Sequence, residues 1–462
     1  MEYKVLTEGD VLFFQSILGK ENVLNSDLEL YAKDCSENLE FFPDIVLKPT
    51  TTDEVSQIVR YCYENLLPIT PRGAGTGLVG GALAVKGGIL ISMENFDRIL
   101  EIDKENFQVT VESGVINYHL QQAVESVGLF YPPDPSSWQS SFIGGNIATN
   151  AGGLKAVKYG VTSQYVLNLE VVLPNGEVIW TGANTLKNST GINLTQLFVG
   201  SEGTLGIITK AVLKLLPKPQ NDVSLLVPFR KLDEACDAVS AIFHANIKPS
   251  CLEFMEQRAI HAAIDFLGIQ SMPMDVEVEA HLLISLDEII EHDLPKLVDV
   301  LTQFDIGDIL FAENELEKNR IWQIRRKVAE VVKQNGYTIE EDTVVPRANL
   351  AKLVREMHDL ADKHSFKVVC YGHAGDGNLH IRINHPIHKN SYNNATIREI
   401  LLELFQIVKN LGGTISGEHG IGLIQKNYLP IVFSSRNLAL QNQIKHSIDP
   451  KNIMNPGKLF KN

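Results

Sequence analysis

The sequence has few cysteines, no long apolar run and a deficit of positive charge, and each of these absences argues against a class of protein. No stretch approaches the roughly 18 uncharged apolar residues of a membrane-spanning helix. Lys and Arg number 41 against 56 Asp and Glu, and this net charge of −15 argues against nucleic acid as the main partner. The five cysteines contain no CxxC pair, which argues against a disulfide framework, a zinc ribbon and an iron–sulfur cluster: Cys35, Cys62, Cys236, Cys251 and Cys370.

The chain nevertheless has the composition of a globular protein with a large core. Its 462 residues are 44% apolar, and a length of roughly 100–200 residues per domain predicts two to four domains. The first residues, MEYKVLTEGD, lack a basic start followed by an apolar run, so we expect no secretory signal. We therefore expect a cytoplasmic protein, and peripheral docking at the inner membrane stays open.

Helices and strands alternate irregularly along the chain. Thr7 and Asp10 resemble a capping box before an apolar helical stripe, and a second helix is expected from Thr52. A buried strand at 67–70 and short strands up to residue 112 give a mixed α+β pattern rather than regular βαβ units. We predict a first domain at 1–218, a second at 219–415, and a C-terminal segment at 416–462 that closes the active site and returns to the first domain. The helices expected in the second domain are 231–244, 314–334, 349–363 and 393–410.

A glycine-dense loop, PRGAGTGLVGG, follows the strand at 67–70. Residues 75–80 satisfy GxGxxG, but a Rossmann turn needs a helix directly after the glycines, and Gly87 and Gly88 interrupt any helix before the next strand. Binding of NAD in that manner is disfavoured. A loop whose consecutive backbone N–H groups surround a pyrophosphate, or a plain tight turn, are the interpretations that remain.

The loop resembles the pyrophosphate loop of FAD-binding proteins of the vanillyl-alcohol oxidase type. Later segments, PPDP, IGGNIATNAGG, KYG and GSEGTLG, are similar to that fold's other FAD contacts and occur in the same order. The resemblance implies an FAD domain of two α+β subdomains. No histidine stands in 71–88, so we expect non-covalent FAD. The implied cofactor-binding residues are Pro71, Arg72, Gly73, Ala74, Gly75, Thr76, Gly77, Pro133, Asp134, Gly144, Gly145, Asn146, Ala148, Thr149, Asn150, Gly152, Gly153, Tyr159, Gly160, Glu202, Gly203, Ile207 and Asn455.

Two histidine-containing segments follow in the second half of the chain. His373 and His380 flank a Gly-Asp-Gly turn between apolar runs, which predicts a hairpin that brings the two rings together. Glu418 and His419 lie between glycines in SGEHGIG. Two imidazoles and one carboxylate would leave a coordination position open, as a catalytic metal needs, although surface histidines and a simple hairpin would give the same pattern.

GHAGDGNLH and SGEHGIG resemble the signatures of the FAD-linked oxidase C-terminal domain, found in glycolate oxidase, D-lactate dehydrogenase and D-2-hydroxyglutarate dehydrogenase. That resemblance implies an antiparallel sheet with helices, and a divalent metal, zinc first and manganese or iron next, bound by His373, His380 and Glu418. His419 is implied as the catalytic base. Arg325, in WQIRRK, is implied as the arginine that binds the substrate carboxylate during catalysis, and Arg347 as a further substrate-binding residue.

The expected reaction is oxidation of a D-2-hydroxy acid to the 2-oxo acid, with hydride transfer to flavin N5. Hydroxyglutarate dehydrogenases have Lys where this chain has Glu340 and Asn where it has Arg382, so a second substrate carboxylate would meet repulsion from Glu340. D-lactate or glycolate is therefore favoured. The alternatives are D-2-hydroxyglutarate oxidation, a non-oxidative synthase of the alkyl-dihydroxyacetone-phosphate type, and a flavin-binding partner subunit.

No haem motif or second nucleotide site is recognisable, so reoxidation of the flavin requires an external electron acceptor. A quinone, an electron-acceptor protein or a partner subunit would serve, and a homodimer is an open alternative for the assembly.

Overall fold

The computed structural model describes residues 2–36, 39–269, 277–312, 314–385 and 394–460. The chain divides into two compact units. The first unit comprises residues 1–152, 161–218 and 418–462, and the second comprises 153–160 and 219–417. The sequence assigns 153–160 to the first domain. These residues group with the second unit because α5 (Ala156–Tyr159) packs against strand β13 (Cys251–Glu256) and Tyr159 donates a hydrogen bond to Asp287.

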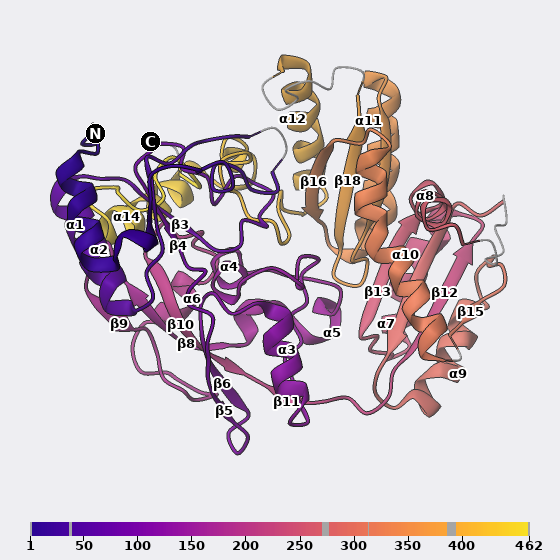
Figure 1. Ribbon diagram of the computed structural model, residues 1–462. Helices are drawn as coiled ribbons and strands as arrows, with labels where there is room; N and C mark the ends of the chain where they lie inside the picture. Colours follow the sequence, from indigo (N-terminus) through magenta and orange to yellow (C-terminus); the bar gives the residue numbers. More distant parts are fainter. Residues whose placement is uncertain (1, 37–38, 270–276, 313, 386–393, 461–462) are drawn as a thin grey trace. The chain divides into compact units, whose positions relative to one another are not determined.

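The first unit contains a four-stranded sheet of order β1-β2-β4-β3, in which β2, β4 and β3 are parallel. Helices α1 and α2 lie side by side next to it (Figure 1), and both begin with a capping box, at Thr7 and at Thr51. Phe14, Val59 and Ile89 belong to the core that joins these helices to the sheet. The elements are α1 (Glu8–Leu18), the 3₁₀ turn Lys20–Asn22, β1 (Val23–Leu24), β2 (Ile45–Leu47), α2 (Thr52–Asn65), β3 (Ile69–Arg72) and β4 (Ile89–Ser92).

A five-stranded antiparallel sheet, β5-β6-β10-β8-β9, forms the other half of the first unit. Its elements, with the helices and short strands around it, are β5 (Ile99–Asp103), β6 (Gln108–Glu112), α3 (Asn117–Glu125), β7 (Leu129–Phe130), α4 (Ile143–Thr149), the 3₁₀ turn Thr162–Gln164, β8 (Val166–Val172), β9 (Val178–Trp180), α6 (Leu194–Phe198), β10 (Ile207–Lys214) and β11 (Leu216–Pro217). The C-terminal segment adds α13 (Leu429–Val432) and α14 (Ser435–Ile448).

The second unit is built on a seven-stranded antiparallel sheet of order β15-β12-β14-β13-β17-β18-β16. Helices α8 and α10 pack on one face of it, against Met255, Leu283 and Val369. The elements are β12 (Val223–Phe229), α7 (Leu232–His244), β13 (Cys251–Glu256), α8 (Gln257–Leu267), β14 (Ala280–Leu286), α9 (Ile290–Leu301), β15 (Leu310–Phe311), α10 (Glu315–Gln334), β16 (Ile339–Val344), the 3₁₀ turn Arg347–Asn349, α11 (Leu350–His364), β17 (Lys367–Gly372), β18 (Asn378–Asn384) and α12 (Ala395–Asn410).

These elements confirm the predicted α+β class, and the four helices expected in the second half of the chain form within two residues of their predicted bounds. In the described part of the chain, none of the helices combines the length and the apolar character that crossing a membrane would require.

Candidate functional site

A cavity of about 470 Å³ lies in the first unit, within the size range of ligand and cofactor pockets. Its walls come from segments far apart in the sequence: the loop after β3, the start of α4 with the residues before it, and the turn before β10. The lining residues include Cys35, Pro71, Arg72, Gly73, Ala74, Gly75, Thr76, Gly77, Met93, Ser113, Pro135, Ser141, Phe142, Gly144, Gly145, Asn146, Ala148, Thr149, Gly152, Ser201, Glu202, Gly203, Ile207, Glu418 and His419.

The glycines of the cavity wall have two different effects on its structure. Gly75 has φ +71°, and a Cβ there would stand 2.2 Å from Nη2 of Arg72, so both backbone and space exclude a side chain. At Gly77 and Gly145 no atom lies within 4 Å of where a Cβ would stand. Side chains at these two positions would occupy open space of the cavity instead of packing against protein, which leaves the backbone of both segments accessible to a ligand.

Three buried polar atoms test whether the cavity suits a polar ligand. Nη1 of Arg72, Oγ of Ser113 and Oγ of Ser141 have no hydrogen-bond partner among the described residues, and all three side chains line the cavity. Buried polar groups in native proteins are nearly always paired, so these atoms favour a ligand with several acceptors. The other terminal nitrogen of Arg72 donates to the carbonyls of Leu30 and Lys33, at 3.1 and 2.8 Å, which fixes the guanidinium in place. A dinucleotide with a pyrophosphate fits this set.

Most of the predicted cofactor residues line the cavity, but seven do not: Pro133, Asp134, Asn150, Gly153, Tyr159, Gly160 and Asn455. Asn455 instead connects two backbone segments, since its Nδ2 donates to the carbonyls of Gly81 and Glu202 at 3.0 and 2.8 Å. Tyr159 and Gly160 belong to the second unit. Sequence reasoning missed Ser113 and Ser141, because single serines beside a strand and before a helix carry no pattern.

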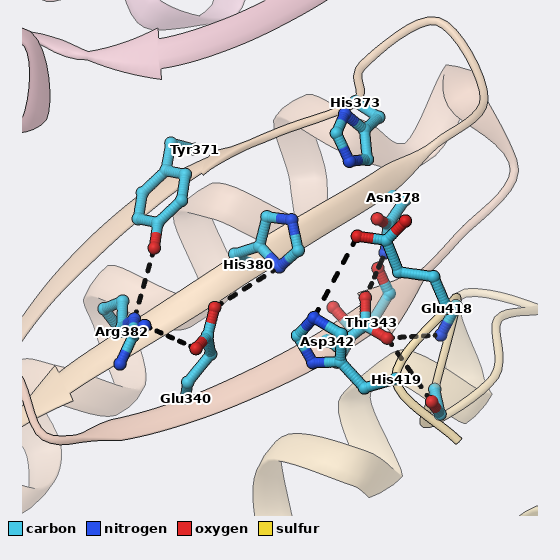
Figure 2. A network of polar contacts seen from close by, with 12 residues as sticks. Glu340, Asp342, Thr343, Tyr371, His373, Asn378, His380, Arg382, Glu418 and His419 are labelled. Carbon is cyan, nitrogen blue, oxygen red and sulfur yellow. Dashed lines mark hydrogen bonds and ion pairs between the residues drawn. The ribbon is translucent and has the colours of Figure 1, made fainter. Parts of the chain in front are cut away.

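Glu418 and His419 line the same cavity of the first unit. His419 Nε2 lies 3.9 Å from Glu418 Oε1, and Figure 2 labels both side chains. The turn that follows them is bound by Glu202, whose two carboxylate oxygens accept the N–H groups of Ile421 and Gly422 at 2.8 and 2.7 Å. Burial raises the pKa of Glu202, and these two N–H groups act in the opposite direction.

In the second unit, strand register gathers polar side chains on one face of the sheet. Tyr371 pairs with His380, which pairs with Asp342, and the neighbouring row pairs Arg382 with Glu340. Directly opposed residues in a sheet point to the same face, so these five side chains share one face. This is the face on which Tyr371 packs with α8 and α10.

The hairpin between β17 and β18 brings His373 and His380 together, as predicted: their ring centroids are 5.4 Å apart. The loop needs glycine, because Gly377 has φ +86° and a Cβ there would lie 2.0 Å from the carbonyl oxygen of Val345. Asn378 N–H donates to the carbonyl of His373 at 3.1 Å and closes the loop.

Glu253, fully buried on β13, links His373 to Arg325. Its two oxygens lie 2.9 and 3.0 Å from Nδ1 of His373, while Arg325 donates from Nε at 2.8 Å and approaches with Nη2 at 2.7 Å. Burial alone would raise the pKa of Glu253, but the charges of His373 and Arg325 outweigh it and hold the pKa below its usual value. Sequence reasoning did not predict Glu253 as a site residue, although a glutamate within an apolar strand is a sign of a functional position.

His380 also lies beside a glutamate that pairs with an arginine, as His373 does. Its Nδ1 lies 3.5 Å from Oε1 of Glu340, and Oε2 of Glu340 forms an ion pair with Arg382. Arg382 Nε donates to the hydroxyl of Tyr371 at 3.2 Å, as Figure 2 shows. Burial, with the charge of Glu340, raises the pKa of Tyr371 to about 12, so this phenol stays protonated at neutral pH. Glu340 therefore lies beside a positive charge, which the repulsion expected from the sequence between Glu340 and a second substrate carboxylate does not include.

Asp342, also fully buried, binds the backbone just before the Glu418–His419 pair. It accepts from Nδ2 of Asn378 at 2.6 Å and from the N–H of Gly417 at 3.0 Å, both within the second unit. Arg347 lies elsewhere: it is exposed, and its guanidinium is 3.9 Å from the ring centroid of Phe243. The structure therefore gathers His373, His380 and Arg325 but does not bring Arg347 to them.

Comparison with known proteins identifies both halves of the chain. Residues 43–182 match the model of the FAD binding domain, and residues 218–459 match the model of the FAD linked oxidases, C-terminal domain. The chain is 40% identical to the glycolate oxidase subunit GlcD of Bacillus subtilis, over 96% of this chain and 95% of that protein. It is 38% identical to a D-lactate dehydrogenase of Anaerostipes hadrus, over 90% and 89% of the two chains.

Among solved structures, p-cresol methylhydroxylase with substrate bound has the same fold, with a TM-score of 0.79 at 19% identity over 99% of this chain and 98% of that one. The matches confirm the predicted family and the predicted FAD-binding fold. The chain belongs to the FAD-linked oxidases, and it is a flavin-dependent oxidoreductase of the group that contains these glycolate oxidase and D-lactate dehydrogenase relatives.

Proposed function

We propose that this protein oxidises a small D-2-hydroxy acid, D-lactate or glycolate first, to the 2-oxo acid. The names of its relatives support this substrate class. The observation that carries the proposal is the position of His419 in the wall of the cavity formed by the glycine-rich segments. Bound FAD supplies the oxidising power, because its ring takes up two electrons with the hydride that leaves the substrate carbon.

His419 is the proposed base. An imidazole has a pKa near neutrality, so it can accept the hydroxyl proton at physiological pH as the hydride departs from Cα. Loss of that proton and that hydride converts the hydroxyl-bearing carbon into the carbonyl carbon of the 2-oxo acid and balances the reaction. The carboxylate of Glu418, 3.9 Å from Nε2, would stabilise the imidazolium that forms.

We also propose that His373, His380 and Glu418 bind a divalent metal, zinc first and manganese or iron as alternatives. The donor set supports this assignment, because two imidazoles and a carboxylate are ligands that zinc commonly takes and a buried glutamate near Nδ1 of each histidine would orient its ring. The ion would act as a Lewis acid that lowers the pKa of the substrate hydroxyl. Metal analysis of the purified protein tests this part separately.

Arg325 is the proposed partner of the substrate carboxylate. Its Nε and Nη2 are directed at Glu253, which leaves further N–H groups of the guanidinium as donors. A planar, permanently charged guanidinium suits a carboxylate. A contribution of Arg347 remains a prediction.

The preference for a monocarboxylate rests on the Glu340–Arg382 pair. Arg382 is already neutralised by Glu340, so a second substrate carboxylate would have to break a buried ion pair to gain a cation. The cost of breaking this ion pair replaces, as the reason for the preference, the repulsion between Glu340 and a second substrate carboxylate that the sequence leads us to expect. D-2-hydroxyglutarate is therefore the weaker substrate candidate.

Anaerobic mixing of the oxidised holoenzyme with D-lactate, L-lactate, glycolate and D-2-hydroxyglutarate tests the proposal. Rapid loss of the oxidised-flavin absorbance with D-lactate or glycolate is expected. A non-oxidative synthase or a passive flavin-binding subunit would leave the flavin oxidised with all four acids, and that result would refute the proposal. Fastest reduction by D-2-hydroxyglutarate would move the enzyme to the other branch of the family.

We propose that the reduced flavin passes its electrons to a quinone, an electron-transfer protein or a partner subunit. The relatives named as the GlcD subunit of glycolate oxidase support a multi-subunit arrangement. Reoxidation rates measured with a soluble quinone and with an artificial one-electron dye would separate two-electron from one-electron acceptors.

A further inference from the structure

We propose that Glu202 is a positioning residue that holds the catalytic turn, rather than a ligand of the flavin. This inference rests on the proposed role of His419 as base. Glu202 lies in the GSEGTLG motif, more than two hundred residues before the turn, and lines the same cavity as His419. The sequence assigns it to cofactor binding, but both of its carboxylate oxygens are directed at protein.

The contact is specific in its geometry. One oxygen accepts the N–H of Ile421 at 2.8 Å and the other the N–H of Gly422 at 2.7 Å. Hydrogen bonds from backbone N–H groups to a buried carboxylate are among the stronger ones in proteins. Two such bonds to successive N–H groups fix the direction of the backbone two and three residues after His419.

The backbone conformation of this turn requires glycine at two positions. Gly420 has φ +83° and Gly422 has φ +50°, and a Cβ at 422 would lie 2.3 Å from the carbonyl oxygen of Val79. The same carbonyl accepts the N–H of Leu423 at 2.8 Å. Glycine makes the turn possible but also leaves it flexible, so a contact outside the turn is needed to hold one conformation.

Glu202 is itself held from both sides. Its N–H donates to the carbonyl of Ala148 at 2.8 Å, and its carbonyl accepts Nδ2 of Asn455 at 2.8 Å. Its φ of +51° is unusual for a residue other than glycine and costs free energy that surrounding contacts must offset. A rigid, strained carboxylate that binds a glycine turn is what positioning of a general base requires, since a displacement of about 1 Å can cost about a hundredfold in rate.

A double-mutant cycle on the FAD-loaded enzyme tests this assignment. Glu202→Gln keeps the shape and one acceptor oxygen, and it should lower the rate of flavin reduction at saturating substrate by about tenfold to a hundredfold. The dissociation constants of FAD and of substrate should change less than threefold. The double variant Glu202→Gln/His419→Asn should be no slower than His419→Asn alone, because a residue that acts only through His419 has nothing left to position.

Two results would overturn the inference. A double variant that is a further tenfold slower than His419→Asn would show that Glu202 acts independently of the base, and a large rise in the FAD dissociation constant of Glu202→Gln would make it a flavin ligand. Glu170→Gln is the matched control, because Glu170 is also a buried, hydrogen-bonded carboxylate of the first unit but contacts Thr52, Thr209 and Lys210 instead. Normal reduction by His419→Asn alone would refute the proposed base and leave the FAD measurement on Glu202 interpretable.

Discussion

Glu253 holds Nδ1 of His373 at 2.9 Å, and through this contact a histidine of a hairpin loop is fixed by a strand more than a hundred residues earlier. The same carboxylate binds Arg325. The proposed metal ligand and the proposed substrate-binding arginine therefore share one buried anion. Glu253 can satisfy both only while it stays ionised, which its lowered pKa ensures.

Replacing Glu253 with Gln should weaken both the fold and the metal site. The change leaves the buried charge of Arg325 without its counter-ion, a loss that typically costs about 3–5 kcal/mol. It also replaces the charged acceptor that orients His373 with a neutral and weaker one, and disturbing such outer contacts typically lowers metal affinity about 10–100-fold. Denaturant unfolding and metal titration measure the two effects. Unchanged metal affinity would mean that His373 is not a ligand or does not depend on Glu253 for its orientation.

Substitution of His419 by Asn should separate cofactor binding from chemistry. The variant keeps a polar side chain of similar size in the cavity wall, so FAD should remain bound. Without a base at this position the rate of flavin reduction by D-lactate should fall by about 10²–10⁴-fold. Stopped-flow absorbance under anaerobic conditions provides the rate, and reduction at the rate of the unmodified enzyme would contradict the assignment.

The Glu340–Arg382 pair should control the choice between mono- and dicarboxylic substrates. In Glu340→Ala the guanidinium of Arg382 loses its partner and becomes available to a second substrate carboxylate. Attraction between unit charges at about 4 Å is worth about 1–4 kcal/mol, so the ratio of kcat/KM for D-2-hydroxyglutarate to that for D-lactate should rise at least about fivefold. Glu340→Asp, which keeps the charge, is the control; an equal shift in both variants would point to space rather than charge.

Sequence reasoning reached the elements of this fold because their signals are local. The capping box at Thr7, the helix from Thr52 and the hairpin around His373 and His380 each depend on neighbouring residues, and the structure has all three. The family motifs were equally readable because glycine spacing in a cofactor loop is a constraint on the backbone of that loop itself.

The partners of the site residues could not be found in this way. Nothing within the sequence around Glu253 indicates that strand β13 will lie beside the hairpin of His373, because that neighbourhood follows from the order of the seven strands. Likewise, the pairing of Glu340 with Arg382 depends on the register of β16 and β18. The sequence identified both residues as departures from a relative's pattern but treated them separately, so the repulsion expected between Glu340 and a second substrate carboxylate took no account of the charge of Arg382.

Lys458 should make the stability of the protein depend on pH in a defined window. Burial lowers the pKa of this amine to about 7 in the folded chain, whereas its ordinary value is 10.5. Between these two pH values the unfolded chain holds more protons than the folded one, so the free energy of unfolding should increase as the pH rises from about 7 towards 10.5. Below pH 7 both states are protonated and the contribution of Lys458 no longer changes. Denaturant unfolding of Lys458→Met across this range should show a smaller slope, and an unaltered slope would contradict the shift.

Gly145→Ala should reduce affinity for FAD without weakening the fold. Gly145 lies in helix α4 with open space where its Cβ would stand, and it lines the cavity. Alanine in a helix is more stable than glycine by roughly 0.5–1 kcal/mol, so the apoprotein should become slightly more stable. Its methyl group would occupy space that the cofactor needs.

Gly9→Ala in α1 is the matched control, because its Cβ would meet only Oγ1 of Thr7 at an ordinary 3.7 Å. Both variants should unfold at a higher denaturant concentration than the parent apoprotein. Only Gly145→Ala should raise the FAD dissociation constant, measured by flavin fluorescence. Equal FAD affinity in both would mean that the flavin does not approach α4.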